Sequence, residues 1–184
     1  MRTFIAVDAP PHVRQAAGRL IEQLSRATSG VRWVAGENMH FTLKFLGEVE
    51  REQTHAIGRA VKQAVAETAP FVVTCGAVGA FPSVGRPRTV WLGLSAGAEA
   101  MARLHKTVDR AMRELRFPRE DQKFHPHLTI GRVRRAARNL PELLRQHADT
   151  ETGQFTVRDV VVYQSDLKPS GPIYTPLARA NLCG

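Results

Sequence analysis

Two periodicities of hydrophobic residues alternate along this chain of 184 residues and predict both α-helices and β-strands. Where hydrophobic residues recur every three or four positions, they cover one face of a helix. The first such helix opens at Pro10-Pro11, because proline is favoured in the first helical turn, and it stops before Ser29-Gly30. Three more predicted helices span residues 51–69, 99–115 and 141–148.

Shorter hydrophobic runs between these helices predict β-strands. The segment from Gly76 to Arg88 is rich in glycine and proline, which favour turns, and it is predicted to be a loop. A tight turn is predicted from Lys168 to Pro172 for the same reason, and another at Gly36-Glu37-Asn38. The predicted strands span residues 3–7, 31–34, 40–46, 71–75, 89–94, 127–130, 155–157, 160–165 and 173–180.

The same short motif occurs at equivalent places in the two halves of the chain. His40-Phe41-Thr42-Leu43 is repeated 87 residues later as His127-Leu128-Thr129-Ile130. The first strands and the first helices of the two halves are offset by 86 and about 87 residues, so the order of elements repeats with the motif. This repeat predicts two similar lobes related by an approximate twofold, with His40 opposite His127.

The chemistry of the motif follows from the geometry of a strand. Successive side chains point to opposite faces, so each histidine lies beside its threonine while the hydrophobic residues between them face the core. Two such strands facing each other bring two imidazoles and two hydroxyl groups around one point. That group of side chains suits acid–base chemistry on a phosphate.

The composition favours an anionic partner. Lysine and arginine number 26 against 17 aspartate and glutamate, a formal net charge of +9, and nucleic acid is the commonest partner of such a charge. A protein from an arginine-rich proteome would have the same composition, so the charge alone does not name the partner. The basic run Arg132, Arg134, Arg135 and Arg138 is a candidate RNA contact, and a solvated charged face is the alternative.

The cysteines and the first residues bear on the cellular compartment. Cys75 and Cys183 lack the spacing of metal ligands, and we predict that they are free thiols in a reducing compartment. The acidic residue Asp8 lies where a signal peptide would have its apolar region, so these first residues do not fit a signal peptide. No apolar run is long enough to span a bilayer. We therefore predict a cytoplasmic protein that makes no membrane contact.

With both copies of the His-x-Thr-x motif (HxTx) placed on predicted strands, the chain resembles the two-histidine phosphoesterases. Within them it is similar to the bacterial and archaeal RNA 2′,3′-cyclic phosphodiesterases, once called 2′-5′ RNA ligases. The resemblance covers nearly the whole chain, with no departure at the catalytic positions. The parts that carry it are residues 4–7, 40–47, 79–82 and 126–132, with Trp91, Ser165, Leu167, Gly171 and Tyr174.

The resemblance implies an α+β fold of two lobes, in which two antiparallel sheets line a central cleft and helices lie outside. Strands are expected to cross between the lobes, so we predict a single two-lobed domain over residues 1–184. The resemblance also implies hydrolysis of RNA 2′,3′-cyclic phosphate ends to 2′-phosphates, an RNA-processing reaction. The reverse joining of RNA ends through a 2′-5′ linkage is expected where both ends are held.

Roles for the motif residues also come from the resemblance. It implies that His40 protonates the departing O3′ and that His127 deprotonates the attacking water. Thr42 and Thr129 would donate hydrogen bonds to the phosphate oxygens as charge builds up. We expect no cofactor and no metal ion.

Three further residues are candidates for substrate binding. Arg132 lies three residues after Thr129, an odd offset that places it on the opposite face of a regular strand unless Gly131 marks a bulge. Contact with the phosphate and a structural pairing are both open for this arginine. Phe124 and Tyr174 could stack on a base, whereas Phe41 is expected to lie in the core.

His125-Pro126-His127 also suggests a metal site. Two histidines without cysteine, aspartate or glutamate close by make a poor closed zinc site, and Pro126 instead indicates the entry to an edge-like strand. We therefore expect a monomer that binds no metal ion. Its expected partner is an RNA with a 2′,3′-cyclic phosphate end, or a cyclic nucleotide.

Two other functions are compatible with the sequence. One is a non-catalytic nucleotide- or RNA-binding module that uses the same cleft. The other is a phosphodiesterase that acts on small cyclic nucleotides. Binding alone would need only hydrogen-bond donors, so the pair of histidines favours an enzyme.

Overall fold

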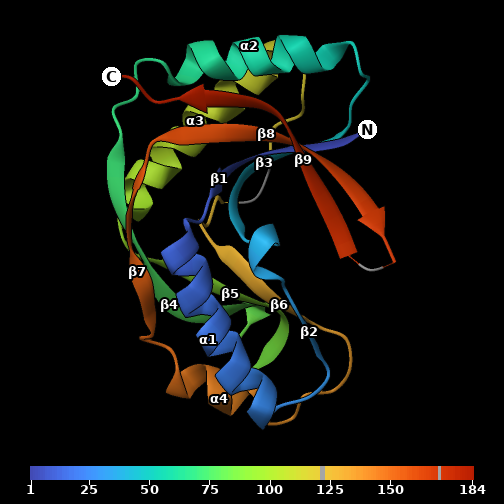
Figure 1. Cartoon of the computed structure of the whole chain (residues 1–184), viewed down its shortest axis with the longest axis vertical. Coiled ribbons are helices and arrows are strands. Elements are labelled where there is room, and N and C mark those ends of the chain that lie inside the picture. Colours follow the sequence, from blue (N-terminus) through green and yellow to red (C-terminus); the bar gives the residue numbers. More distant parts are fainter. Residues whose placement is uncertain (121–122, 170) are drawn as a thin grey trace.

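The strands of the computed structural model, which describes residues 1–120, 123–169 and 171–184, form one antiparallel sheet flanked by helices (Figure 1). The elements are β1 (Arg2–Asp8), α1 (Pro11–Ala27), β2 (Val31–Trp33), a 3₁₀ turn (Gly36–Asn38), β3 (His40–Glu48), α2 (Gln53–Val65), β4 (Phe71–Ser83), β5 (Arg86–Ala96), α3 (Ala98–Glu114), β6 (Leu128–Val133), α4 (Leu140–Gln146), β7 (Glu151–Val157), β8 (Asp159–Lys168) and β9 (Gly171–Asn181). Within these residues the sheet has the strand order β7-β4-β5-β6-β3-β1-β8-β9, and β2 pairs with β6.

The sheet is divided into two lobes at its middle, where β3 and β6 pair through Phe41 and Leu128. The first lobe contains β1, β3, β8 and β9, and helices α2 and α3 pack against it. The second lobe contains β2, β4, β5, β6 and β7, and helices α1 and α4 cover it. The predicted two-lobed α+β fold is therefore confirmed, and the two predicted sheets are continuous through this narrow junction.

The two halves of the sequence exchange elements between the lobes. β4, from the first half, pairs with β5 in the second lobe, and β8, from the second half, pairs with β1 in the first. The helices follow the same pattern, because α1 packs on β7 whereas α3 packs on β3. This exchange obeys the approximate twofold that the repeat predicts, and each lobe is built from both halves.

The core lies between the helices and one face of the sheet. Helix α1 buries Val13, Ala17, Leu20 and Leu24, which recur at the helical spacing read from the sequence. Full burial of a valine or leucine side chain contributes about 1.5–3 kcal/mol through removal from water. None of the helices in the described part of the chain is long and apolar enough to cross a membrane.

The predicted loop from Gly76 to Arg88 is wrong, because most of it belongs to the hairpin of β4 and β5. Its glycines serve packing. A Cβ atom on Gly79 would lie 2.3 Å from the ring of Trp91, its partner in the ladder, so the indole covers a position that only glycine leaves open. The loop prediction failed because glycine was taken as a turn signal.

The other boundaries lie within three residues of the predictions, except that α2 ends at Val65 instead of residue 69 and β7 begins at Glu151 instead of residue 155; the second motif strand begins at Leu128, one residue after His127. Helix α1 begins at Pro11, and the segment of Gly36 to Asn38 forms a 3₁₀ turn. The predicted turn at Lys168 to Pro172 includes Ser170, which lies outside the described residues. Pro126 does precede a strand, but β6 is not at an edge, because it pairs with β5 on one side and with β2 and β3 on the other.

A buried ion pair fixes the first motif strand to helix α3. The side chain of Lys44 is 1% exposed, and its Nζ donates to Asp109 at 2.6 Å and to the carbonyl of Pro118 at 2.9 Å. A register shift in the pairing of β1 with β3 accompanies this inward turn, because Ile5 pairs with Lys44 while Ala6 pairs with Thr42. The bulge lets β3 face the cleft at Thr42 and the core at Lys44.

Candidate active site

The register of the central strands brings the two motifs together. Phe41 pairs with Leu128 in an antiparallel ladder. Continuing that ladder by one residue in each direction sets His40 opposite Thr129 and Thr42 opposite His127. Each histidine thus faces the threonine of the other motif, as the approximate twofold requires. The structure brings together all four residues that the sequence singles out, and their catalytic role stays a prediction.

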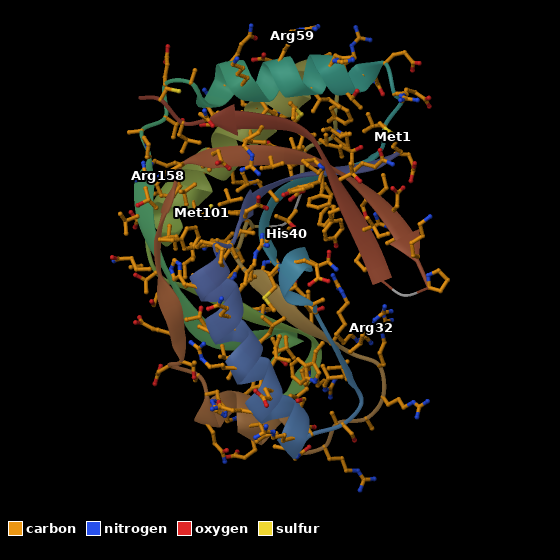
Figure 2. The ribbon with its side chains drawn as sticks, in the orientation of Figure 1. Met1, Arg32, His40, Arg59, Met101 and Arg158 are labelled. Atoms are coloured by element: carbon orange, nitrogen blue, oxygen red, sulfur yellow. The ribbon has the colours of Figure 1, made fainter. Side chains whose placement is uncertain are left out.

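His40 lies at the start of β3, between the two lobes (Figure 2). Its ring stacks on Phe4 at a centroid distance of 4.7 Å and meets the ring of Tyr174 edge-on at 5.1 Å. It also makes a hydrogen bond with the backbone of Asn38. Burial among these groups disfavours the imidazolium and lowers the pKa of His40 to about 4.

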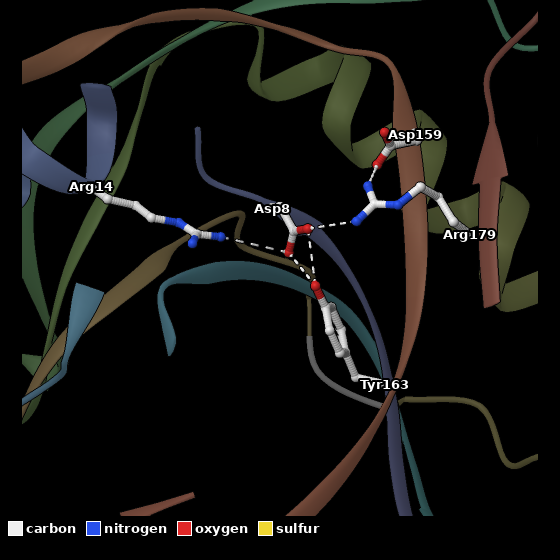
Figure 3. A network of polar contacts seen from close by, with 5 residues as sticks. All are labelled: Asp8, Arg14, Asp159, Tyr163 and Arg179. Atoms are coloured by element: carbon white, nitrogen blue, oxygen red, sulfur yellow. Dashed lines mark hydrogen bonds and ion pairs between the residues drawn. The ribbon is translucent and has the colours of Figure 1, made fainter. Parts of the chain in front are cut away.

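Figure 3 shows a network of charged and polar side chains centred on Asp8, the residue that pairs with His40. Asp8 pairs with His40 in the ladder of β1 and β3, and the hydroxyl of Tyr163 donates to both Asp8 carboxylate oxygens, at 2.8 and 3.0 Å. Arg179 bridges Asp8, at 3.3 Å, and Asp159, at 2.6 Å, while Arg14 approaches the other Asp8 oxygen at 4.0 Å.

The carboxylate at the centre of this network acts on His40 through its charge. Burial is the largest effect on the histidine and lowers its pKa, whereas the negative charge of Asp8 raises that pKa. Arg14 and His127 act in the opposite direction to Asp8. Burial, followed by the hydrogen bond to Asp8, also raises the pKa of Tyr163 to about 12, which keeps its hydroxyl a donor at neutral pH.

His127 has different neighbours. The Nδ1 atom of its ring lies 2.7 Å from the carbonyl oxygen of His125, so neutral His127 donates from Nδ1 and leaves the Nε2 lone pair available. Phe81 meets the ring edge-on at 5.0 Å. Burial lowers the pKa of His127, and the nearby charges of His125 and Arg132 lower it further. Each motif histidine therefore bonds to the backbone two residues before it, but the surrounding charges differ.

Arg132 shares the face of Thr129 because of a bulge. In the ladder of β5 and β6, Thr89 pairs with Arg132 while Trp91 pairs with Thr129, so two steps along β5 match three along β6. Gly131 pairs with Val90, so the extra residue is Ile130, next to the glycine at which a bulge was required if Arg132 was to face the cleft. The exposed guanidinium is close enough to influence the pKa values of both His127 and Tyr174.

Two cavities border the motif histidines. The His40 cavity has a volume of about 420 Å³ and includes several polar side chains; it is lined by Asp8, Arg14, Glu37, Asn38, Met39, His40, Tyr163, Pro172, Ile173, Tyr174 and Pro176. The His127 cavity has a volume of about 300 Å³ and is rich in phenylalanine; it is lined by Thr42, Leu43, Phe45, Phe81, Glu120, Lys123, Phe124, His125 and His127. One cavity therefore lies beside each histidine.

The aromatic candidates are divided between these cavities. Tyr174 lines the His40 cavity, and burial raises the pKa of its hydroxyl. Phe124 lines the His127 cavity, where its ring stacks on His105 at 4.1 Å with nearly parallel planes. Phe41 is fully buried, which confirms its expected place in the core.

Among the described residues, no group of three or more histidine, cysteine, aspartate and glutamate side chains is arranged to hold a metal ion. Cys75 and Cys183 are both free, as predicted, and burial raises the pKa of Cys75 to about 11.

Asp8, Tyr163 and Phe45 were not predicted from the sequence to belong to the site. A signal for Asp8 was present, because Phe4, Ala6 and Asp8 alternate along β1 and so share one face with the motif of the neighbouring strand. Tyr163 could not be placed there, because its strand comes from the far end of the chain. Phe45 fits the hydrophobic pattern of β3, and no sequence feature marks it as 55% exposed.

Comparison with known proteins adds three findings. A family model described as the 2′-5′ RNA ligase superfamily matches residues 9–169. The RNA 2′,3′-cyclic phosphodiesterases of Archaeoglobus fulgidus and Methanothermobacter thermautotrophicus are 38% and 34% identical over 177 and 179 residues, 96% of this chain in both cases and 98% and 96% of the relatives. The crystal structure of TT0787 of Thermus thermophilus superposes with a TM-score of 0.86 at 30% identity, covering 100% of this chain and 99% of that one.

Proposed function

The chain belongs to the 2′-5′ RNA ligase superfamily, and on this premise we propose that it hydrolyses RNA 2′,3′-cyclic phosphate ends to 2′-phosphates. One observation carries the proposal: the pairing of Phe41 with Leu128 brings together the two half-buried imidazoles of His40 and His127, each of which belongs to the residue just before this pair. A pair of histidines with lowered pKa values can divide the two proton transfers of a phosphodiester cleavage between them.

His127 is the proposed base. Its Nδ1–H bond to the His125 carbonyl fixes the tautomer, so the Nε2 lone pair is available to take a proton from water. The positive charge of Arg132 disfavours a proton on His127 in the resting protein. The activated water forms a new O–P bond as the proton passes to Nε2.

His40 is the proposed acid. It donates a proton to O3′ as the P–O3′ bond breaks, which leaves the phosphate on O2′ and a free 3′-hydroxyl. Burial opposes a proton on His40, and the Asp8 carboxylate favours it. A bound phosphate diester adds a second negative charge beside the ring, and this raises the pKa of His40 when the substrate enters. Asp8 is therefore a positioning residue whose charge helps His40 to take up a proton once the phosphate is bound.

Three hydrogen-bond donors stabilise the negative charge that builds up on the phosphate. Thr42 and Thr129 present hydroxyl groups to the non-bridging oxygens, and the guanidinium of Arg132 reaches the same face of β6. Both proton transfers are assigned to protein side chains, and the mechanism needs no metal ion. The positive charge of this arginine also attracts the phosphates of an RNA chain. A small cyclic nucleotide lacks these additional phosphates, and for this reason RNA ends are the proposed substrate.

The same two proton transfers apply when an alcohol replaces water as the nucleophile. If a 5′-hydroxyl of a second RNA end attacks the cyclic phosphate, the product is a 2′-5′ phosphodiester and the roles of His40 and His127 are unchanged. The observation that favours this second reaction is the size of the cavity beside His127.

Product analysis tests the main proposal. A short oligonucleotide ending in a 2′,3′-cyclic phosphate is incubated with the protein in the presence of EDTA, and the products are separated by chromatography against synthetic 2′- and 3′-phosphate standards. We expect the 2′-phosphate to form. Binding without turnover would favour the RNA-binding module, and a marked preference for cyclic mononucleotides over the oligonucleotide would favour the small-nucleotide phosphodiesterase.

A further inference from the structure

The bulge in β3 leaves the residue after Thr42 without a partner in the sheet. One step along β1 matches two steps along β3, from Lys44 to Thr42, so Leu43 is the extra residue. On the other side of β3, the described residues pair with β6 only through Phe41. Leu43 is buried, and its carbonyl oxygen needs a partner from elsewhere, because an unpaired backbone group away from water is costly.

Helix α3 supplies this partner. The Nδ1 atom of His105 lies 2.8 Å from the carbonyl oxygen of Leu43, and a carbonyl oxygen only accepts, so the ring donates a hydrogen bond to the bulged residue. Asp109, four residues later on the same face of α3, binds the next residue of β3, Lys44, at 2.6 Å. The helix therefore holds β3 at the two residues that follow Thr42.

The same histidine also contacts the segment that leads into the second motif. The ring of His105 stacks on Phe124 at a centroid distance of 4.1 Å, with an angle of 3° between the ring planes. Phe124 comes directly before His125, whose carbonyl oxygen accepts the hydrogen bond that fixes the tautomer of His127. A shift of Phe124 would therefore move the group that orients the second motif histidine.

We propose that His105 is a positioning residue that sets the place of Thr42 through Leu43 and the place of His127 through Phe124. The inference rests on the proposed function, in which Thr42 is a donor to the phosphate and His127 is the base. Their action depends steeply on their distance from the reacting atoms. His105 lines neither cavity, so it acts through these residues and not on the substrate.

Two substitutions separate the two contacts of His105. His105→Phe keeps a ring that can stack on Phe124 and removes the donor to Leu43, whereas His105→Asn keeps an N–H group at the δ position and removes the ring. The substrate is an oligonucleotide with a 2′,3′-cyclic phosphate end. In each variant we expect kcat to fall about two- to tenfold, the kinetic equivalent of one neutral hydrogen bond or one aromatic stack. KM should change little, because the affected groups act mainly in the transition state.

Double variants identify the residue through which each contact acts. If the donor acts through Thr42, adding His105→Phe to Thr42→Ala lowers kcat no further. If the stack acts through His127, adding His105→Asn to His127→Ala lowers the residual rate no further. A merely structural role would lower the rate by the same factor in the presence and in the absence of these partners.

A histidine on the other long helix of the sequence repeat provides the matched control. The Nε2 atom of His12, on α1, lies 2.9 Å from the carbonyl oxygen of Gln154, and His12 lines neither cavity. His12→Phe therefore removes the same kind of contact away from the site, and kcat should stay at the wild-type value. Urea unfolding gives the folded fraction of every variant, and each kcat is corrected for it.

The remaining outcomes would contradict the inference. Wild-type kcat in both His105 variants would overturn it, and so would losses that multiply in full in the double variants. Either result, obtained with an active wild-type protein, leaves the proposed function standing. An absence of turnover in the wild type would mean that the proposed function itself has failed, and the role of His105 with it.

Discussion

His40 and His127 occupy equivalent positions of an internal repeat, yet their environments differ. Both rings are held by the backbone two residues earlier, and both pKa values are lowered by burial. Beside His40 lies a carboxylate that favours a proton, whereas the charged groups acting on His127 are cationic. The backbone thus keeps the twofold while the flanking side chains break it, and only the broken part can give the histidines different roles.

The largest expected effect is the loss of either histidine. His40→Ala and His127→Ala should each reduce turnover by about 10²–10⁴, the usual contribution of one acid–base group, while circular dichroism stays unchanged. A substrate with sulfur in place of O3′ then separates the two. A thiolate is a good leaving group without protonation, because a thiol has a pKa of about 8.5. We expect this substrate to restore most of the activity of His40→Ala and none of that of His127→Ala.

Rescue of His127→Ala by the sulfur substrate would mean that the roles are reversed. Full activity of either alanine variant on the ordinary substrate would contradict the two-histidine mechanism altogether.

The lowered pKa of buried His40 should also affect the stability of the protein without substrate. The folded pKa of His40 is about 4 and its ordinary value is 6.5, so between these pH values the unfolded state is protonated and the folded state is not. The free energy of unfolding therefore decreases as the pH falls through this window, by about 3 kcal/mol at pH 4 at ~1.4 kcal/mol per unit.

Urea unfolding at pH 7.5 and pH 4 measures this effect. His40→Phe should lose less stability than the wild type between the two pH values, by about the same 3 kcal/mol. His127→Phe should show a change of the same sign, because burial lowers that pKa too. A pH dependence in His40→Phe equal to that of the wild type would show that His40 is not held neutral in the folded protein.

The threonines test the part of the site that stays symmetric. Thr42→Ala and Thr129→Ala should each raise the activation free energy by about 1.5–3 kcal/mol, the net value of one hydrogen bond to a charged group. Equal costs are expected, because each threonine faces the opposite histidine in the same way. Steady-state kinetics measure the cost of each variant, and Thr→Ser at each position is the matched control that keeps the hydroxyl. Unequal costs for Thr42→Ala and Thr129→Ala would show that the two threonines are not equivalent.

The smallest expected effect belongs to the carboxylate that breaks the symmetry. Asp8→Asn removes the charge that favours protonated His40 in the substrate complex, so the alkaline limb of the kcat profile should move to lower pH and kcat at pH 8 should fall about tenfold. Asp159→Asn is the control, because Asp159 binds the same Arg179 but does not line the His40 cavity. A shift of the acid limb instead would assign the base role to His40.

The sequence was sufficient for the features that depend on local pattern. Helix α1 and the two motif strands follow from hydrophobic spacing, and the offset of 87 residues predicts the pairing of the motifs. The hairpin of β4 and β5 was missed because its glycines are required by the indole of Trp91, a contact between strands that spacing does not reveal. Tyr163 and Arg179 were missed for a related reason, since they meet Asp8 only after β8 and β9 have joined β1.

The exchange of strands between the lobes has a consequence for how the chain acquires its fold. β1 can pair with β8 only after more than 150 residues have been looped out, and contacts of such high sequence separation slow folding. A ribosome releases β1, β3 and His40 early, but Tyr163 and Tyr174, which complete the His40 environment, leave the exit tunnel among the last of these residues. The site of the first histidine therefore matures after that of the second. A nascent chain that has emerged only as far as residue 158 should bury His127 and leave His40 exposed to solvent.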